Sequence, residues 1–343
     1  MKAAYRCPSN IALVKYWGKK EGGTQLPANP SISLTLGDLY ADTSVEIVSG
    51  NVSGKPAFDF LFQDQPKPSF TPKLDVFFRR IWDGYELVRN HRLLIRSTNN
   101  FPHGTGIASS AAGFGALALC IYDLQQQLYP LPDSPHHEAS RIARLGSGSA
   151  CRSLFAAPAI WGEHEKIAGS SDEYAIPFSG EIAPELQILM DAVLIVDAGE
   201  KKVSSSEGHG LLQQNPYASA RYGVAKDNLI KICNALETGS LHRFISIVES
   251  EALQLHAMMM VSNPYYILMR PGTLSIIENV WAFRENTGVP LMFTLDAGAN
   301  VHLLFPKMYT SEVTNFIEGN LLLYCQNRQY LCSTTGVAPQ KLH

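Results

Sequence analysis

A strand, a glycine-rich turn and a long apolar helix follow one another in the first half of this chain, and no other feature constrains its fold as strongly. The short run His91–Ser97 has an apolar centre, which predicts a strand. The run Ser110–Tyr129 is largely apolar, which predicts a buried helix. Gly104-x-Gly106-x-x-Ser109-Ser110 joins the two. A helix of this kind must be covered by other elements, so we expect layers of helices and strands.

The glycine-rich turn is typical of a phosphate-binding loop. Its glycines let the backbone approach an anion, and the N–H groups and dipole of the following helix favour negative charge. Ser109 and Ser110 add hydroxyls that can reach phosphate oxygens or a magnesium ion. The turn is not a Walker A loop, because no lysine precedes the two serines, and Ser109 replaces the third glycine of a dinucleotide-binding fingerprint. The alternative is a connection that only turns the chain.

Length and charge exclude some classes of protein. A chain of 343 residues suggests about two domains. A hydrophobic content of 45% and a charged content of 17% are ordinary for a globular protein. The net charge of −3 argues against a general binder of nucleic acid or anionic membranes. It does not argue against anionic small substrates, since a pocket can carry the opposite local charge.

Cysteine usage and the N-terminus bear on the compartment. The six cysteines form no C-x-x-C pair and have no histidine at zinc-like spacing, so six reduced thiols are expected (Cys7, Cys120, Cys151, Cys233, Cys325 and Cys332). Met1–Pro8 lacks the apolar core of a signal peptide, and no apolar run approaches membrane-spanning length. We therefore expect a cytoplasmic protein.

The other predicted elements mix strands and helices without strict alternation, which favours an α+β fold over a doubly wound sheet. Strands are expected at Met1–Cys7, Ser31–Leu36, Thr43–Val48, Ala57–Phe62, Ala156–Trp161, Ala192–Val196, Pro290–Leu295 and Val301–Pro306. Helices are expected at Asp75–Val88, from Ser134-Pro135 to Leu145, and at Val224–Glu237, Leu241–Met260 and Thr273–Thr287.

Two further segments stand out beside the glycine-rich turn. Asn10–Lys19 places two lysines, a tyrosine and a tryptophan beside an extended apolar run, and Gly146–Ser153 alternates glycine and serine before Cys151-Arg152. Together the three segments are typical of a pocket for a polyanionic substrate and a nucleoside triphosphate. Cys151 is not expected to be a nucleophile, and Met258–Met260 is expected to be core.

These segments identify a family resemblance. Asn10–Lys19 resembles the N-I-A-x-x-K-Y-W-G-K signature of mevalonate diphosphate decarboxylases in the GHMP kinase superfamily. Other stretches resemble further motifs of that family, in the same order along the chain: Asn29–Leu36, Asn99–Pro102, Gly106–Gly113, Gly146–Ser153, Lys201–Ser205 and Thr294–Asn300.

The resemblance implies a two-lobed GHMP kinase fold. The N-terminal lobe, residues 1–186, would be ribosomal-S5-like, and the C-terminal lobe, residues 187–343, ferredoxin-like. It also implies ATP, Mg²⁺ and mevalonate diphosphate as ligands, with no nucleic acid or membrane partner, and a homodimer. The implied reaction phosphorylates the tertiary 3-hydroxyl, then releases phosphate and CO2 to give isopentenyl diphosphate.

The resemblance also implies the catalytic residues. Asp296 would face the 3-hydroxyl; its ordinary pKa of roughly 3.9 is too low to ionise a free alcohol, so it would orient the hydroxyl and take the proton late. Arg152 would bind the substrate carboxylate with two hydrogen bonds, and Lys15 would lie near Asp296 and keep it ionised. The alternatives are a turn-forming aspartate, a surface ion pair and a solvated lysine.

Binding residues follow in the same way. Substrate contacts are expected from Tyr16, Lys19, Ser147, Ser149, Arg152 and Ser205, although the serines could be turn formers only. Nucleotide contacts are expected from Asn99, Asn100, Gly104, Gly106, Ala108, Ser109 and Ser110, with Ser110 as a magnesium ligand. Trp17 is expected to be packed.

Two segments depart from the family's pattern, His103-Gly104-Thr105 and Ser206-Glu207-Gly208-His209. The second replaces a segment that lies near the substrate diphosphate in the family it resembles, which gives the hypothesis that His209 is a pH-dependent donor there. Substrate would then bind more tightly at about pH 6 than at about pH 8. Rival functions are a kinase that stops at the 3-phosphate, a non-catalytic metabolite sensor, and a homoserine- or galactose-type kinase.

Overall fold

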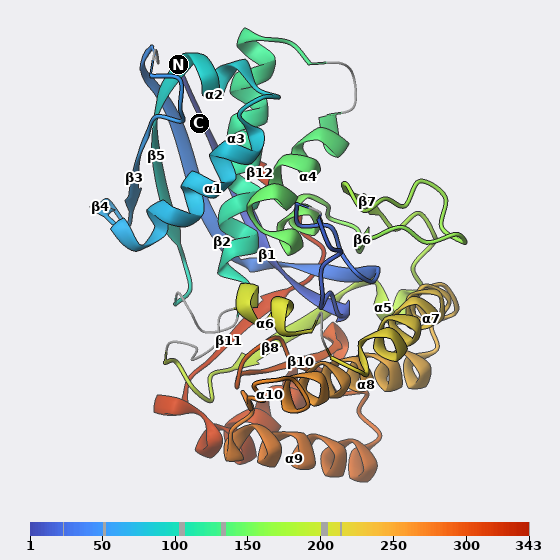
Figure 1. Cartoon of the computed structure of the whole chain (residues 1–343). Helices are drawn as coiled ribbons and strands as arrows, with labels where there is room; N and C mark the ends of the chain where they lie inside the picture. Colours follow the sequence, from blue (N-terminus) through green and yellow to red (C-terminus); the bar gives the residue numbers. More distant parts are fainter. Residues whose placement is uncertain are drawn as a thin grey trace.

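The computed structural model describes residues 1–22, 24–50, 53–102, 107–131, 135–199, 205–212 and 215–342. Two lobes lie one above the other, each built on its own sheet (Figure 1). The N-terminus and the C-terminus lie close together at the far end of the first lobe. The α+β, two-lobed architecture predicted from the sequence is confirmed.

The first sheet has the strand order β12-β1-β2-β5-β3-β4, with β6 and β7 added beside β2. Neighbours are antiparallel except for β3 and β5. Its strands are β1 (Lys2–Val14), β2 (Ser31–Gly50), β3 (Phe58–Phe62), β4 (Gln65–Pro66), β5 (His91–Asn99), β6 (Ala159–Trp161), β7 (Ala175–Pro177) and β12 (Gln340–Lys341). β1 and β2 are long enough to run from the outer core to the junction of the lobes (Figure 1).

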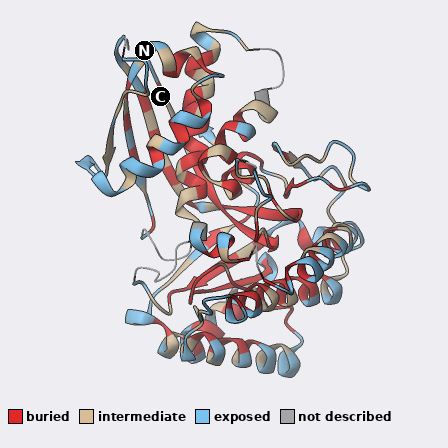
Figure 2. Cartoon of the chain, in the orientation of Figure 1, coloured by how far each residue is buried: buried red, intermediate tan, exposed pale blue. Residues whose placement is uncertain are grey.

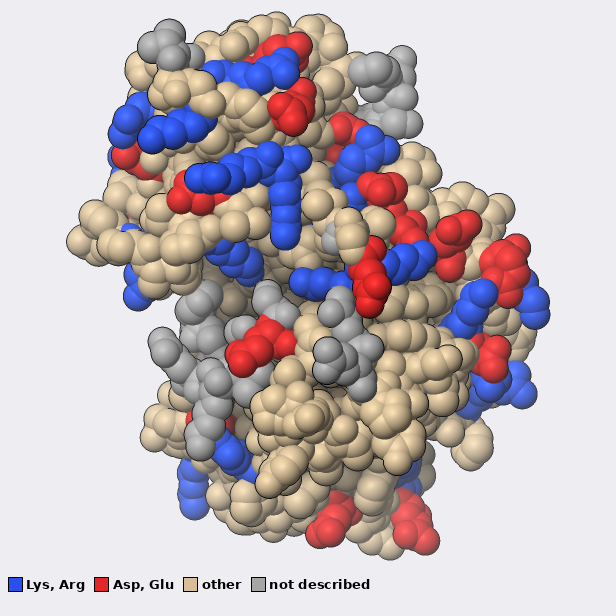
Figure 3. Space-filling view, viewed as in Figure 1, with Lys and Arg blue, Asp and Glu red and all other residues tan. Residues whose placement is uncertain are grey.

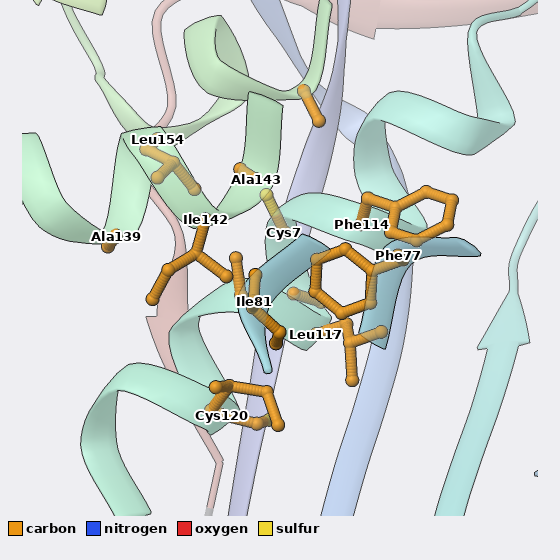
Figure 4. Close-up of a cluster of buried hydrophobic side chains, with 14 of the residues drawn as sticks. Cys7, Phe77, Ile81, Phe114, Leu117, Cys120, Ala139, Ile142, Ala143 and Leu154 are labelled. Carbon is orange, nitrogen blue, oxygen red and sulfur yellow. The ribbon is translucent and has the colours of Figure 1, made fainter. Parts of the chain in front are cut away.

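Helices cover one face of this sheet. They are α1 (Thr71–Ile81), α2 (Glu86–Asn90), α3 (Ser109–Leu128) and α4 (Pro135–Gly146), followed by the 3₁₀ turn η2 (Gly148–Leu154). Phe77, Phe114, Leu117 and Ile142 from three of these helices meet in one apolar cluster (Figure 4). α3 lies at its centre, as its apolar sequence requires (Figure 2).

The second sheet is antiparallel, with the order β11-β8-β10-β9. Its strands are β8 (Leu189–Leu194), β9 (Met292–Thr294), β10 (Val301–Pro306) and β11 (Tyr330–Thr334), and the main helices of this lobe are α7 (Ala218–Thr238), α8 (Leu241–Met260) and α9 (Pro271–Thr287). The shorter elements are α5 (Pro184–Gln187), α6 (Ser205–Leu211), α10 (Thr310–Phe316), the 3₁₀ turns η1 (Pro68–Phe70), η3 (Lys307–Tyr309), η5 (Leu322–Tyr324) and η6 (Gln326–Arg328), and the π-helical turn η4 (Ile317–Leu321).

The two lobes share a hydrophobic core. Ile11 and Ile32 of the first sheet pack in one cluster with Leu304 of the second sheet and with residues of α7 and α8. The C-terminal end of the chain also returns from the second lobe to the first, where β12 pairs with β1. The lobe boundary after residue 186 stays a prediction, and β12 lies in the first sheet although it follows that boundary.

Most predicted elements are present, with some differences in extent. α8 and β10 have the predicted bounds, whereas the two strands predicted at 31–36 and 43–48 are the single strand β2. The single helix predicted at Asp75–Val88 is wrong: α1 ends at Ile81, and a turn through Gly84 leads into α2. Glycine weakens a helix, and here it lets the apolar faces of two short helices turn separately toward the core. Within the described residues, no helix is both long and apolar enough to cross a membrane.

Candidate functional site

Three charged side chains from distant parts of the chain meet where the lobes join. Lys15 follows β1, Arg152 lies in η2, and Asp296 lies in the turn after β9. Lys15 Nζ is 3.3 Å from Asp296 Oδ1. The ion pair predicted between Lys15 and Asp296 is therefore present, and it joins residues 281 positions apart.

Burial dominates the electrostatics of the two cations. Lys15 and Arg152 are each only 2% exposed. Burial lowers the pKa of Lys15 because it removes water from the ammonium group, and the Asp296 carboxylate opposes that change. Burial likewise lowers the pKa of Arg152, and Asp296 again opposes it. The Asp296 side chain is 26% exposed, so the carboxylate can meet a ligand while it offsets both charges.

Two serines of β2 hold the Arg152 guanidinium. Nε donates to Ser33 Oγ at 2.9 Å, and Nη1 donates to Ser31 Oγ at 2.5 Å. Within the described chain, no hydrogen bond is made by Nη2. The remaining N–H groups on Nη1 and Nη2 can take a carboxylate in a two-bond contact.

The three sequence segments come together around this group. Ser110 Oγ lies 3.1 Å from Ser147 Oγ, which joins the start of α3 to the Gly146–Ser153 segment. Asn10 Nδ2 donates to Ser153 Oγ at 2.7 Å, which joins that segment to β1. Ala108, immediately before α3, has a positive φ of 37°. This strained turn directs the first N–H groups of α3 toward the cleft end of the helix.

A pocket of about 160 Å³ lies beside the start of α3. Its walls combine aromatic rings with polar groups: Phe60, Phe62, Phe70, Phe114, Ile95, Leu74, Leu117, Gly113, Thr43, Ser97, Asn99, Ser109, Ser110 and Lys73. Asn99, predicted as a nucleotide contact, lines it. Asn100 does not, because its side chain bonds to the backbone of Asp38 and Tyr40.

Lysine and arginine side chains gather on the first lobe over α1 (Figure 3). Lys73 lines the pocket, and the residue as a whole is exposed. The protein around its ammonium group lowers its pKa to about 8, chiefly by displacing water and then by repulsion from Lys19. Burial also lowers the pKa of Lys19, with Arg80 adding repulsion. Among the described residues neither lysine has a carboxylate partner. These mutually repelling cations form a site that an anion would stabilise.

Lys73 and Arg80 were not predicted as site residues. Both lie on α1 seven positions apart, which is two helical turns, so they share one face. The predicted helix began at Asp75 and therefore left Lys73 out. Their position opposite Lys19 could not be obtained from the sequence, because it depends on how α1 packs across the sheet.

His209 does not behave as the sequence suggested. Its ring lies between those of Tyr16 and Trp17, with both centroids 4.4 Å away, and Nδ1 accepts the Gly18 N–H at 2.9 Å. Burial lowers the pKa of His209 to about 3, with repulsion from Lys19 adding to the shift. The hypothesis of a pH-dependent donor between pH 8 and 6 is therefore wrong, because His209 stays neutral throughout that range.

Tyr16 lies beside this ring with its hydroxyl buried and without a hydrogen-bond partner in the described chain. A side chain at Gly148 would come within 2.9 Å of that hydroxyl, so the glycine makes room for it. Trp17 is packed, as predicted.

The structure describes the remaining predicted binding residues only in part. Ser149 is half-buried, and its carbonyl accepts a hydrogen bond from Asn10. Gly104 and Gly106 lie outside the described residues, as do His103 and Thr105 of the first departure. Ser205 begins α6, but its side chain, like that of Ser206, is not described. The binding roles of Ser205, Gly104 and Gly106 stay predictions.

Comparisons with known proteins agree over nearly the whole chain. A family model for a diphosphomevalonate decarboxylase-like N-terminal domain matches residues 7–175. A model for a mevalonate 5-diphosphate decarboxylase C-terminal domain matches residues 192–341.

Among curated proteins, the diphosphomevalonate decarboxylase of Gibberella zeae is 32% identical over 89% of this chain and 81% of its own length. That of Aspergillus fumigatus is 31% identical over 93% and 80%. Two solved structures have similar folds. The Staphylococcus aureus mevalonate diphosphate decarboxylase is 27% identical, with a TM-score of 0.82 over 100% of this chain and 98% of its own. A complex of MDDEF with MVAPP, AMPPCP and magnesium is 27% identical, with a TM-score of 0.82 over 100% and 99%.

Proposed function

This chain belongs to the family of diphosphomevalonate decarboxylases, and from that premise we propose how the residues of its cleft divide the work. The enzyme uses ATP and Mg²⁺ to convert mevalonate 5-diphosphate to isopentenyl diphosphate, ADP, phosphate and CO2, a step of isoprenoid biosynthesis by the mevalonate pathway. The contact of Lys15 with Asp296 beside Arg152 is the observation that carries the assignment of roles.

The chemistry sets what the cleft must do. A tertiary hydroxide is a poor leaving group, so the 3-hydroxyl oxygen first takes the γ-phosphoryl group and ADP departs. The C3–O bond then breaks with its electron pair on phosphate, which leaves positive charge at C3. The electrons of the bond between the carboxylate and C2 form the C2–C3 double bond, and CO2 leaves. The cleft must hold three anionic groups together while this happens.

Asp296 orients the 3-hydroxyl and receives its proton as the oxygen bonds to phosphorus. Phosphoryl transfer through a loose transition state develops little alkoxide, so a carboxylate of ordinary basicity is sufficient. Lys15, 3.3 Å away, keeps Asp296 ionised before the transfer. The partial exposure of Asp296 lets the hydroxyl reach it.

Arg152 holds the substrate carboxylate. Ser31 and Ser33 fix the guanidinium plane, so little side-chain freedom is lost when the carboxylate binds. The charge of Arg152 also resists loss of CO2 until positive charge has formed at C3. Ser147 and Ser149 lie in the same segment and supply hydroxyls to the bound substrate.

The diphosphate lies among Lys19, Lys73 and the Tyr16 hydroxyl. Burial is the main cause of the lowered pKa of both lysines, with repulsion from Arg80 added at Lys19 and repulsion from Lys19 added at Lys73. The Tyr16 hydroxyl is buried without a partner in the described chain, so all three groups gain when an anion arrives. Lys19 and Lys73 together favour a diphosphate over a monophosphate, because the second phosphate group adds negative charge within reach of both ammonium groups.

The nucleotide lies between the aromatic pocket and the start of α3. The pocket takes the base, with Asn99 as a polar contact, while Ala108, Ser109 and Ser110 bring N–H and hydroxyl groups to the phosphates. These donors suit a triphosphate with its metal, because hydroxyl oxygens are hard ligands. Mg²⁺, when bound, neutralises charge on the transferring phosphates, and Ser110 would be its protein ligand.

An assay of ADP release with CO2 trapped tests this function. Mevalonate, its 5-phosphate and its 5-diphosphate are each supplied with ATP and Mg²⁺. We expect ADP and CO2 in equal amounts, and only with the 5-diphosphate at low substrate concentration. ADP without CO2 would indicate a kinase that stops at the 3-phosphate, and ATP binding without turnover would indicate a sensor.

Homodimer formation and a cytoplasmic location belong to the same proposal. Exposed apolar side chains on the second lobe, Tyr217, Val261, Tyr265 and Ile267, could be covered by a second copy. The six cysteines are free, as expected in a reducing compartment. Light scattering at micromolar concentration tests the first point, with a mass near twice 37.7 kDa expected. Fractionation of cells tests the second.

A further inference from the structure

We propose that helix α8 positions the catalytic pair through two buried residues, Glu251 and His256, which hold the backbones of Lys15 and Asp296 respectively. Both are positioning residues, since neither contacts the reacting atoms in this account. The inference rests on the proposed roles of Lys15 and Asp296.

Glu251 fixes the end of β1. Its side chain is fully buried, and Oε2 accepts the backbone N–H of Lys15 at 2.9 Å. The carboxylate is itself held from α7, where Arg221 Nη2 donates to Oε2 at 2.5 Å and Asn228 Nδ2 donates to Oε1 at 2.7 Å. A buried carboxylate with three donors has one orientation, so Lys15 is tied to a rigid helix pair.

His256 fixes the turn that carries Asp296. The residue is 1% exposed, and ring Nε2 lies 3.1 Å from the backbone oxygen of Asp296. A carbonyl oxygen only accepts, so Nε2 carries the hydrogen in this contact. The same oxygen accepts the N–H of Gly298 at 2.7 Å. Two hydrogen bonds to the backbone oxygen of Asp296 therefore fix the position of the turn.

Glu251 and His256 lie on one helix, α8. Glu251 and His256 are five residues apart, which places them about 7.5 Å apart along the helix axis. One rigid element therefore holds both backbones from which the Lys15 and Asp296 side chains reach each other at 3.3 Å. An error of about 1 Å in such a site can reduce the rate about 100-fold.

Glu249 provides a matched comparison on the same helix. It is also a buried carboxylate. Arg284 Nη1 at 2.6 Å and Trp281 Nε1 at 3.0 Å, both on α9, donate to it, and Oε1 also accepts the backbone N–H of Phe293 on β9 at 3.4 Å. A glutamine here keeps an oxygen acceptor for Phe293 and removes the charge, and it leaves the contacts of Glu251 and His256 to Lys15 and Asp296 in place. Glu249 therefore separates general damage to α8 from loss of the positioning contacts.

The test compares two amides at position 256. In His256→Gln the side-chain N–H₂ can reach the place of Nε2, whereas in His256→Asn the shorter side chain cannot. We expect kcat of His256→Asn to fall about 30- to 100-fold with KM for both substrates within about twofold, and His256→Gln to retain most of the wild-type kcat. Glu251→Gln should lower kcat in the same way, while Glu249→Gln should lower Tm and keep kcat.

The outcomes separate the possible errors. Equal kcat values for His256→Asn and His256→Gln, with both proteins folded by circular dichroism, would overturn the inference. So would a Glu249→Gln variant with the same kcat loss as Glu251→Gln. Normal turnover of Asp296→Asn in parallel assays would contradict the proposed role of Asp296 itself. That result would be distinct from a failure of the inference about α8.

Discussion

Lys15, Arg152 and Asp296 place two positive charges and one negative charge in a largely buried space. Burial alone would favour loss of a proton from Lys15, and Asp296 is the neighbour that most strongly opposes this. In the proposed mechanism the Asp296 carboxylate has two tasks, to face the substrate hydroxyl and to keep Lys15 charged. The substrate carboxylate would add the second negative charge, which would balance Arg152.

Asp296→Asn should remove nearly all turnover, because it removes the proton acceptor and the carboxylate that pairs with Lys15. We expect kcat to fall by about 1,000-fold or more, with ATP affinity within about twofold of the wild type. Stopped-flow or steady-state ADP release, with nucleotide titration by calorimetry, measures both. Asp59→Asn, at an exposed carboxylate paired with Arg92, is the control and should behave as wild type.

Arg152→Lys should be severely impaired, since a point charge cannot reproduce the planar fork held by Ser31 and Ser33. We expect kcat/KM for mevalonate diphosphate to fall about 100-fold or more. Arg6→Lys alters a second planar contact, with Asp42 on the far part of the sheet, and should leave turnover unchanged. Normal kcat/KM in Arg152→Lys would show that the two-bond carboxylate contact is wrong.

Because of Lys73, KM for the substrate should rise on the alkaline side of its pH profile. Its pKa is lowered to about 8, so the side chain is charged below that pH and neutral above it. Binding of an anion is therefore strongest below pH 8 and weakens as pH rises, with KM increasing by up to about tenfold per pH unit. Lys73→Arg stays charged and should flatten this limb between about pH 7.5 and 9. A profile identical to wild type would exclude Lys73 from the diphosphate site.

At the scale of single elements, the contacts of His209 hold the short helix α6 in place, and we call these contacts the latch. His209 accepts the Gly18 N–H and its ring lies between those of Tyr16 and Trp17, so α6 is joined to the segment after β1 that carries Lys15 and Lys19. A positively charged imidazole could not accept this hydrogen bond, and the nearby Lys19 repels it. The latch therefore exists only while His209 is neutral.

The latch predicts a dependence of stability on pH. The pKa of His209 is lowered from 6.5 to about 3, so between these values the unfolded chain binds the proton and the folded chain does not. Stability from this residue is complete above about pH 6.5 and is lost as pH falls toward 3. In His209→Asn, Oδ1 can replace Nδ1 as acceptor without titrating. Its Tm should fall less than that of the wild type between pH 6.5 and 4, measured by scanning calorimetry; parallel curves would contradict the latch.

Some elements could be predicted from sequence because their signals are local. α8 has a long apolar periodicity with no glycine or proline, and β10 is a short apolar run before Pro306, so both were predicted with the observed bounds. The division between α1 and α2 was missed because Trp82 and Leu87 continue the apolar pattern across Gly84. Packing, not periodicity, decides whether such a chain bends.

At the scale of the whole molecule, the active site is a property of the junction between lobes. The shared core around Ile11, Ile32 and Leu304 brings β1 next to the second sheet, and only then can Lys15 meet Asp296. The sequence predicted which segments converge, because their motifs resemble a family. It could not predict the cations of α1, the latch of His209 or the contacts of Glu251 and His256, because each partner comes from a distant element.

The decisive measurement is a crystal structure of Asp296→Asn with mevalonate diphosphate, AMPPCP and Mg²⁺. We expect the 3-hydroxyl within hydrogen-bond distance of the side chain at position 296, the substrate carboxylate on Nη1 and Nη2 of Arg152, and the diphosphate between Lys19 and Lys73. A substrate bound with its carboxylate away from Arg152, or its 3-hydroxyl facing away from position 296, would contradict it.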